Sequence, residues 1–140
     1  MKNDNRIHFI RFQNLDPHEL FKNIKTPCYV IDEAMLEYDG EILKGVRERT
    51  GCKILLAQKC FSNYDLYPVL EKYLDGTEAS GLFEARLGKE EMPSKEVHTF
   101  CGAFREDEFE EVLKYSDHII FNSVGQLKKF GAMAKNAGRE

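Results

Sequence analysis

The sequence predicts an α/β fold in which short strands alternate with helices and build a parallel sheet. Short apolar runs, typical of buried strands, alternate with longer segments whose apolar residues recur at helical spacing. Four of the runs close at Lys59, Ser80, Cys101 and Asn122, which follow one another at equal intervals. Equal strand–helix units favour parallel strands and bring these closing residues to one edge of the sheet.

The chain is predicted to divide into two parts. Residues 1–27 contain few positions suited to a core, and we expect an N-terminal extension there. Residues 28–140 are expected to form the folded domain. Its first element is the apolar run over residues 28–31, whose tyrosine, valine and isoleucine favour a short strand.

A helix is predicted over residues 33–50. Asp32 is suited to cap its first turn, and Gly51 fits its end because glycine readily adopts the left-handed conformation found there. Gly40 lies inside the helix and disfavours it, since a mid-helix glycine costs about 1 kcal/mol.

The same strand–helix unit then repeats along the chain. The helix predicted over residues 106–115 illustrates the pattern, because Phe109, Val112 and Leu113 share one face at i, i+3 and i+4. The other elements expected are strands over residues 53–58, 77–79, 96–100 and 118–121, and helices over residues 66–74, 82–89 and from 124 onward.

Two architectures accommodate these units. A (β/α)₈ barrel has eight strand–helix units and typically about 250 residues, whereas this chain has 140 residues and about four barrel strands. The chain is therefore either a small open α/β sheet or the N-terminal part of a (β/α)₈ TIM-like barrel whose other strands are missing. We favour the second alternative, the N-terminal part of a barrel.

The composition argues against several classes of function. The formal net charge is -4 and the pI is near 5.6, which argues against a nucleic-acid partner. No apolar stretch is long enough to span a bilayer or to form a secretory signal, so no membrane partner is expected. The four cysteines form no CxxC pair and the four histidines lack ligand spacing, so no metal site is predicted. A reducing cytoplasm is the expected compartment.

Lys59 is the candidate catalytic residue. It follows the apolar run 54–58, so it is expected at the edge where strand–helix proteins place their chemistry. A lysine that is partly shielded from water there can lose its proton and form a Schiff base with a carbonyl compound. The alternative is a solvated lysine that closes a strand.

Several collinear blocks resemble one enzyme family. They are TPCYVID (26–32), GCKILLAQK (51–59), YLDGTEAS (73–80), FEARLG (83–88), KEVH (95–98) and YSDHIIFNS (115–123). With these blocks the chain resembles carboxynorspermidine (carboxyspermidine) decarboxylase. That family belongs to the pyridoxal-phosphate enzymes of fold type III, with the ornithine, diaminopimelate and arginine decarboxylases. Gln58 departs from the family pattern, which leads us to expect an apolar residue there.

The resemblance implies specific roles. Lys59 matches the lysine that holds pyridoxal 5'-phosphate covalently, and Ala57 matches a position close to the cofactor. Residues 28–140 would then be an incomplete pyridoxal-phosphate-binding barrel domain. Members of the family work as homodimers, and a β-rich domain follows their barrel.

The expected function is that of a fragment of a carboxy-lyase in polyamine (spermidine) biosynthesis, acting on a small polyamine carboxylate. We expect the 140-residue chain alone to be inactive. The alternatives are an ornithine, arginine or diaminopimelate decarboxylase of the same fold, a non-catalytic truncated relative, and a binding module.

Overall fold

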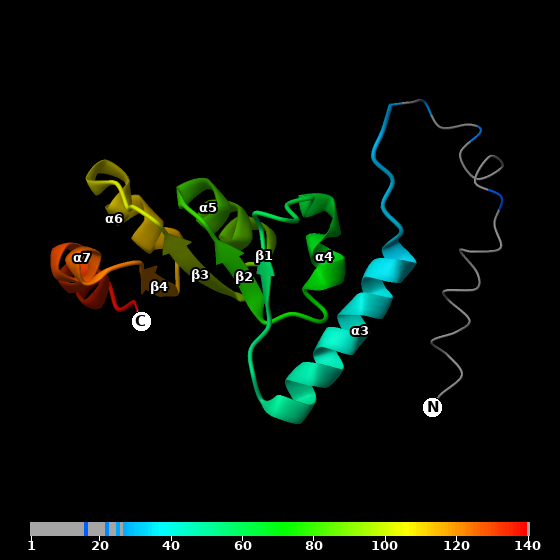
Figure 1. Cartoon of the computed structure of the whole chain (residues 1–140), viewed down its shortest axis with the longest axis horizontal. Coiled ribbons are helices and arrows are strands. Elements are labelled where there is room, and N and C mark those ends of the chain that lie inside the picture. Colours follow the sequence, from blue (N-terminus) through cyan, green and yellow to red (C-terminus); the bar gives the residue numbers. More distant parts are fainter. Residues whose placement is uncertain (1–15, 17–21, 23–24, 26, 140) are drawn as a thin grey trace.

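Four parallel strands form one sheet at the centre of the molecule (Figure 1). The computed structural model describes residues 27–139 together with Asp16, Lys22 and Lys25. The strands follow the order β1-β2-β3-β4. Their bounds are Leu55–Ala57, Gly76–Ala79, Glu96–Cys101 and His118–Phe121. Because all neighbouring pairs are parallel, the predicted α/β class with a parallel sheet is confirmed.

Helices precede, connect and follow the strands. They are α3 (Glu33–Thr50), the short 3₁₀ helix η1 (Tyr64–Leu66), α4 (Tyr67–Leu70), α5 (Leu82–Glu91), α6 (Glu106–Tyr115) and α7 (Val124–Asn136). The helix expected over residues 66–74 ends early at Leu70. The N–H of Tyr73 donates to the carbonyl of Leu70, three residues back, and this tighter turn closes the helix.

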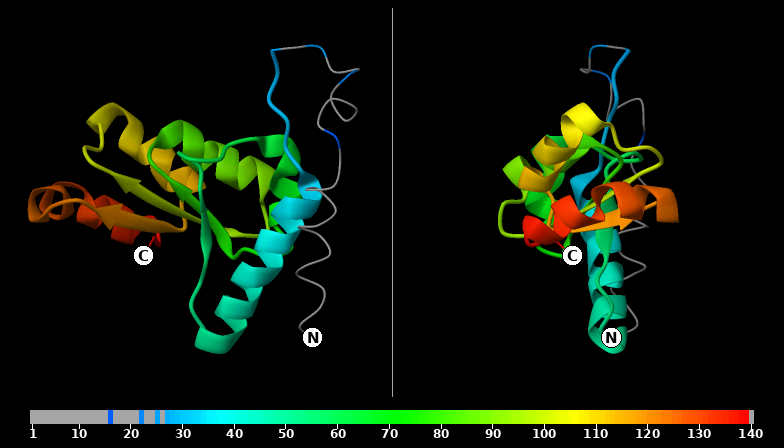
Figure 2. Two further views of the ribbon diagram at one scale, coloured as in Figure 1. Left: turned by 45° about the vertical axis from the view of Figure 1, so that its right-hand side comes forward. Right: turned by 90° about the vertical axis from the view of Figure 1, so that its left-hand side faces the viewer.

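Helix α3 has the ends that the sequence predicts. The Asp32 carboxylate accepts from the N–H groups of Ala34 and Met35 at 2.9 and 3.2 Å, and Gly51 adopts a left-handed φ of 70°. The carboxyl end of the helix projects past the sheet in both views of Figure 2. Gly40 also has a physical explanation: a Cβ there would lie 2.5 Å from the ring of Tyr73, so α3 packs on this ring only with glycine.

The strand predicted over residues 28–31 is wrong. These residues belong to no helix or strand, and the apolar side chains of Tyr29, Val30 and Ile31 are exposed. A strand requires a neighbour with which to exchange backbone hydrogen bonds. Within residues 27–139, the sheet contains β1 to β4 alone, so the apolar run finds no such neighbour.

The two faces of the sheet differ. Helices α4, α5 and α6 follow one side of it (Figure 1), and there Thr77, Val97 and Thr99 are fully buried. The opposite side, here called the helix-free face, carries residues that alternate with these along the strands. Its members include Ala57, Glu78, Glu96, His98, Phe100, His118 and Ile120. Phe100 and Ile120 are 38% and 41% exposed, so no described element covers this face.

The core lies on the helix-covered side. One cluster is built from Phe104, Phe109 and Phe130 with their aliphatic neighbours, and it joins α6 and α7 to β4. A second cluster around Tyr67 and Met92 joins α4 to the sheet. None of the described helices combines the length and apolar character needed to cross a membrane.

The strands end together at one edge. Register pairs Ala57 with Glu78 and Cys101 with Phe121. The observed last residues of β2, β3 and β4, which are Ala79, Cys101 and Phe121, lie at or directly before the predicted closing positions, whereas β1 ends at Ala57, two residues before Lys59. This carboxyl edge therefore positions the candidate site.

Candidate active site

Lys59 lies in a turn directly after β1. The strand expected over residues 53–58 is shorter than predicted, because the N–H groups of Cys60 and Phe61 both donate to the carbonyl of Ala57, at 3.1 and 3.3 Å. This turn ends the strand and places Lys59 at the carboxyl edge, as predicted. The expectation that its amine is shielded from water is wrong within the described part of the chain, where Lys59 is exposed.

Glu78, on the neighbouring strand, carries a charge that interacts electrostatically with Lys59. Burial and the nearby Glu84 carboxylate raise the pKa of the Glu78 carboxyl, while the positive charge of Lys59 acts in the opposite direction. The sequence did not predict a role for Glu78. An acidic side chain inside the short strand 77–79 was the available signal, because its register with Ala57 puts it beside the candidate lysine.

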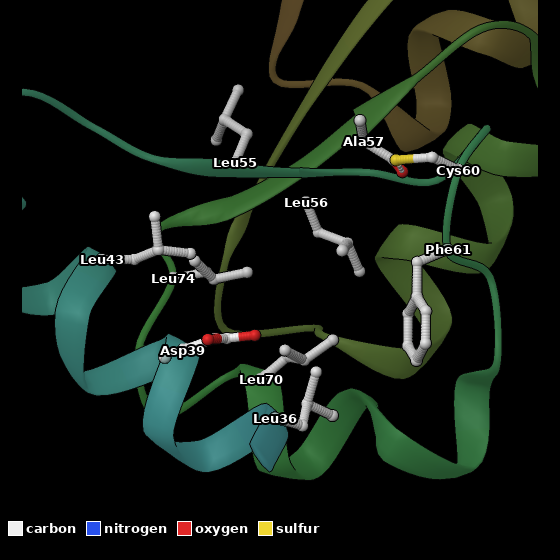
Figure 3. Close-up of a pocket in the computed structure, with 11 residues that line it drawn as sticks. Leu36, Asp39, Leu43, Leu55, Leu56, Ala57, Cys60, Phe61, Leu70 and Leu74 are labelled. Atoms are coloured by element: carbon white, nitrogen blue, oxygen red, sulfur yellow. Dashed lines mark hydrogen bonds between the residues drawn. The ribbon is translucent and has the colours of Figure 1, made fainter. Parts of the chain in front are cut away.

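Ala57 points to the helix-free face. In Figure 3 Leu55 and Ala57 project to one side of β1, and Leu56 projects to the other. Ala57 is exposed, and its methyl group leaves the space beside the Lys59 turn open. Ala57 and Lys59 therefore lie close together at one edge of the sheet.

The adjacent apolar pocket is a separate feature. It has a volume of about 360 Å³ and lies between α3, β1 and α4, where Leu36, Leu56 and Leu70 surround it (Figure 3). Its lining includes Ala57 and Cys60 but not Lys59. The pocket is therefore a packing gap beside β1 and does not contain the candidate amine.

Gln58 anchors the turn that carries Lys59. Its side chain is 1% exposed, its Nε2 donates to the Glu84 carbonyl at 2.8 Å, and its Oε1 accepts from the Tyr67 hydroxyl at 3.0 Å. Burial, followed by Glu84 and Glu91, raises the pKa of Tyr67 to about 12. The polar residue at this apolar-looking position therefore has satisfied hydrogen bonds that tie the turn to α4 and α5.

The other residues that close strands serve local turns. The Ser80 N–H donates to the Glu84 carboxylate at 2.6 Å, and Asn122 donates through its backbone to Gln126 and through its side chain to the Gly102 carbonyl. The Ser123 hydroxyl caps α7 by accepting from the Gln126 N–H. These residues lie on the same edge as Lys59, and their hydrogen bonds run to the helix that follows or, for the Asn122 side chain, to the loop after β3.

Strand register also gathers Glu96, His98 and His118 on the helix-free face. The carboxylate oxygen Oε2 of Glu96 is 2.9 Å from His98 Nε2 and 3.5 Å from His118 Nε2. Hydrogen bonds from Lys53 and then His98 lower the pKa of Glu96 to about 2, so this carboxylate is ionised at neutral pH. The sequence did not predict the cluster, because its members come from two strands.

Comparison with known proteins identifies relatives. No protein-family model matches the chain. It is 40% identical over 113 residues to a carboxynorspermidine/carboxyspermidine decarboxylase of Herminiimonas arsenicoxydans, covering 81% of this chain and 31% of that protein. The enzyme of the same name from Campylobacter jejuni is 43% identical over 110 residues, covering 79% of this chain and 28% of that protein. A carboxyaminopropylagmatine decarboxylase of Synechocystis is 32% identical over 123 residues, covering 88% of this chain and 32% of that protein.

Solved structures agree in fold. The crystal structure of Campylobacter jejuni carboxynorspermidine decarboxylase complexed with norspermidine matches with a TM-score of 0.77 and 42% identity, covering 80% of this chain and 30% of that one. A diaminopimelate decarboxylase from M. jannaschi matches with a TM-score of 0.66 and 24% identity, covering 88% of this chain and 30% of that one. At this identity the match shows the fold alone.

The strands and helices therefore form part of a decarboxylase fold, and the chain spans about 30% of the length of the relatives that it matches. The predicted resemblance is confirmed, and this chain is a relative of the carboxynorspermidine/carboxyspermidine decarboxylases.

Proposed function

We propose that this chain carries the cofactor-binding lysine of a decarboxylase that acts on carboxynorspermidine or carboxyspermidine in polyamine biosynthesis. The observation that supports it most is Lys59, an exposed amine at the carboxyl edge of β1 beside Glu78, in a chain related to enzymes of that name. The Synechocystis relative favours one second candidate, a carboxyaminopropylagmatine substrate.

The residues present fit pyridoxal 5'-phosphate as the cofactor. The Lys59 amine is reachable for covalent attachment of an aldehyde, and Ala57 offers a small side chain on the helix-free side of β1. When bound, this cofactor supplies an electron sink for the negative charge left after carbon dioxide departs. Lys59 would hold it and exchange it with the substrate amine, which requires the neutral form of the lysine.

The turn itself contributes positioning. Gln58 is fixed by Tyr67 and by the Glu84 carbonyl, so the residue next to Lys59 cannot move freely. Glu78 offers a carboxyl group within electrostatic reach of the amine. We assign Gln58 and Tyr67 as positioning residues, because they act on the site through the backbone of the turn.

The proposed function does not include catalysis by this chain alone. Lys59 is exposed, whereas a lysine that reacts as a neutral amine is favoured by removal from water. The relatives are about three times as long as the part that matches. We therefore propose that the 140-residue chain releases no carbon dioxide by itself.

The remaining features of the proposal carry over what the sequence leads us to expect. We propose a barrel-type domain over residues 28–140 preceded by an extension over residues 1–27, a cytoplasmic location, and homodimers in the functional enzyme. The exposed apolar residues Tyr29 and Val30 support a further protein surface against residues 28–31. The small net charge of -4 and the absence of a basic cluster argue against nucleic-acid or membrane partners.

Titration of the chain with pyridoxal 5'-phosphate tests the proposal. We expect the absorption band of a lysine-bound cofactor in the wild type, its loss in Lys59→Ala, and its retention in Ala57→Gly. Carbon dioxide release from carboxynorspermidine is expected to stay at background. A band that is unchanged in Lys59→Ala would contradict the assignment of the lysine.

A further inference from the structure

The cluster of Glu96, His98 and His118 has the composition of a metal site. Glu96 and His98 are two residues apart on β3, so both side chains emerge on the helix-free face. His118 on β4 is the register partner of His98. Two imidazoles and one carboxylate form a ligand set that zinc and related divalent transition metals use in proteins.

The ligand atoms are already close to the spacing that such an ion needs. A tetrahedral zinc ion with bonds of about 2.0–2.1 Å separates its ligand atoms by about 3.4 Å. Glu96 Oε2 is 2.9 Å from His98 Nε2 and 3.5 Å from His118 Nε2, and all three ligand atoms lie within 4.8 Å of one another. Small side-chain rotations therefore suffice to receive an ion.

The surroundings support and orient the ligands. The rings of His98 and His118 stack with centroids 4.1 Å apart, which limits their rotation. Lys53 binds the other carboxylate oxygen, Oε1, so Oε2 remains directed at the two imidazoles. An outer partner of this kind commonly fixes the orientation of a ligating carboxylate.

An ion can reach the cluster from solvent. A polar pocket of about 390 Å³ opens beside it, and its lining includes Glu96 and His118. The charged groups around the pocket are Lys53 and Arg139, which oppose a cation, and Asp117, which favours one. The ammonium of Lys53 is hydrogen-bonded to Oε1, the carboxylate oxygen that is not the proposed metal ligand.

We propose that Glu96, His98 and His118 bind one divalent transition-metal ion such as zinc and thereby link β3 to β4. Three protein ligands leave a further coordination position for water. The proposal is independent of the cofactor at Lys59, because it concerns other residues of the helix-free face. Binding to the folded state alone stabilises it in proportion to the logarithm of the free metal concentration.

The test uses the full chain with its thiols blocked by N-ethylmaleimide, so that the four cysteines cannot bind the metal. Zinc is titrated in competition with a chromophoric chelator, cobalt absorbance reports the ligand geometry, and thermal unfolding is followed with and without zinc. We expect one equivalent to bind, a tetrahedral cobalt spectrum, and a higher unfolding temperature with zinc.

Two variants remove one ligand each. His118→Phe keeps a ring to stack on His98 but lacks the nitrogen, and Glu96→Gln keeps the size of the side chain. Each should weaken zinc binding at least about tenfold, the lower end of the loss seen when even an outer partner of a ligand is removed. Metal-free unfolding of both variants reports whether the fold is intact, and either folded variant suffices for the test.

The matched control is the double variant His8→Asn/His18→Asn, which removes the other two histidines of the chain. We expect it to bind zinc as the wild type does. Zinc binding that is absent from the thiol-blocked protein, that survives in a folded His118→Phe or Glu96→Gln variant, or that disappears in the control would overturn the proposal.

Discussion

At the residue scale, the candidate site depends on side chains that hold a turn in place. Gln58 is buried next to an exposed lysine, and its amide group is satisfied by Tyr67 and by the carbonyl of Glu84. A buried polar group of this kind costs free energy once a partner is removed. The position of Lys59 is therefore linked to the stability of its neighbours.

Tyr67→Phe should destabilise the chain. The change leaves Gln58 Oε1 buried without its hydroxyl donor, which costs about 1–3 kcal/mol of unfolding free energy. Urea unfolding measures this loss, and Tyr64→Phe is the control because Tyr64 is 54% exposed and should change little. Equal stabilities for the two variants would contradict the role of the Tyr67–Gln58 hydrogen bond.

Tyr67 also predicts an alkaline limit to stability. Its folded pKa is raised from 10.0 to about 12, so the contribution of the neutral hydroxyl is full below about pH 10 and is lost as the pH rises toward 12. The wild type should therefore lose stability relative to Tyr67→Phe over this range. A stability difference that stays constant across the range would show that the hydroxyl is not held in a buried setting.

Glu78→Gln should stabilise the chain at neutral pH. Burial and Glu84 raise the folded pKa of Glu78 above 4.5, so the neutral carboxyl is favoured and its ionisation costs stability as the pH rises through the folded value. The advantage of the variant should shrink as the pH falls toward the ordinary carboxyl pKa. Thermal unfolding of both proteins at neutral pH and near the ordinary carboxyl pKa checks this. A stability advantage of Glu78→Gln that grows on acidification would contradict it.

At the element scale, glycines decide how closely helices approach their neighbours. Gly40→Ala would put a Cβ 2.5 Å from the Tyr73 ring and should cost about 1–3 kcal/mol. Gly45→Ala in the same helix meets only the flexible Arg49 side chain at 3.4 Å and should gain up to about 1 kcal/mol from helix propensity. Chemical denaturation of both variants tests the pair, and a gain in Gly40→Ala would show that α3 does not pack on Tyr73 as described.

Local signals explain which elements were predictable. The ends of α3 follow from Asp32 and Gly51, and α6 and β4 have the predicted bounds because their apolar spacing is regular. The strand expected over residues 28–31 failed because strand formation depends on a neighbour, which local composition cannot reveal. Likewise, the approach of His118 to Glu96 and His98 depends on strand register, and no spacing along the chain encodes it directly.

At the scale of the whole molecule, one face of the sheet forms the core and the other carries the candidate functional residues. The helix-covered side holds the apolar clusters, while the helix-free face carries Glu78, two histidines and the edge at Lys59. The lysine was predicted from its place after an apolar run. Its exposure was not predicted, because whether a side chain is buried depends on contacts made by distant parts of a protein.

Covalent trapping at Lys59 tests the central claim most directly. The chain is mixed with pyridoxal 5'-phosphate, reduced with borohydride, digested and mapped by mass spectrometry, with the exposed Lys128 on α7 as internal control. We expect the cofactor mass on Lys59 at substoichiometric cofactor, little label on Lys128, and no preferred site in Lys59→Ala. Labelling spread evenly over the lysines, or concentrated on any lysine other than Lys59, would contradict the account.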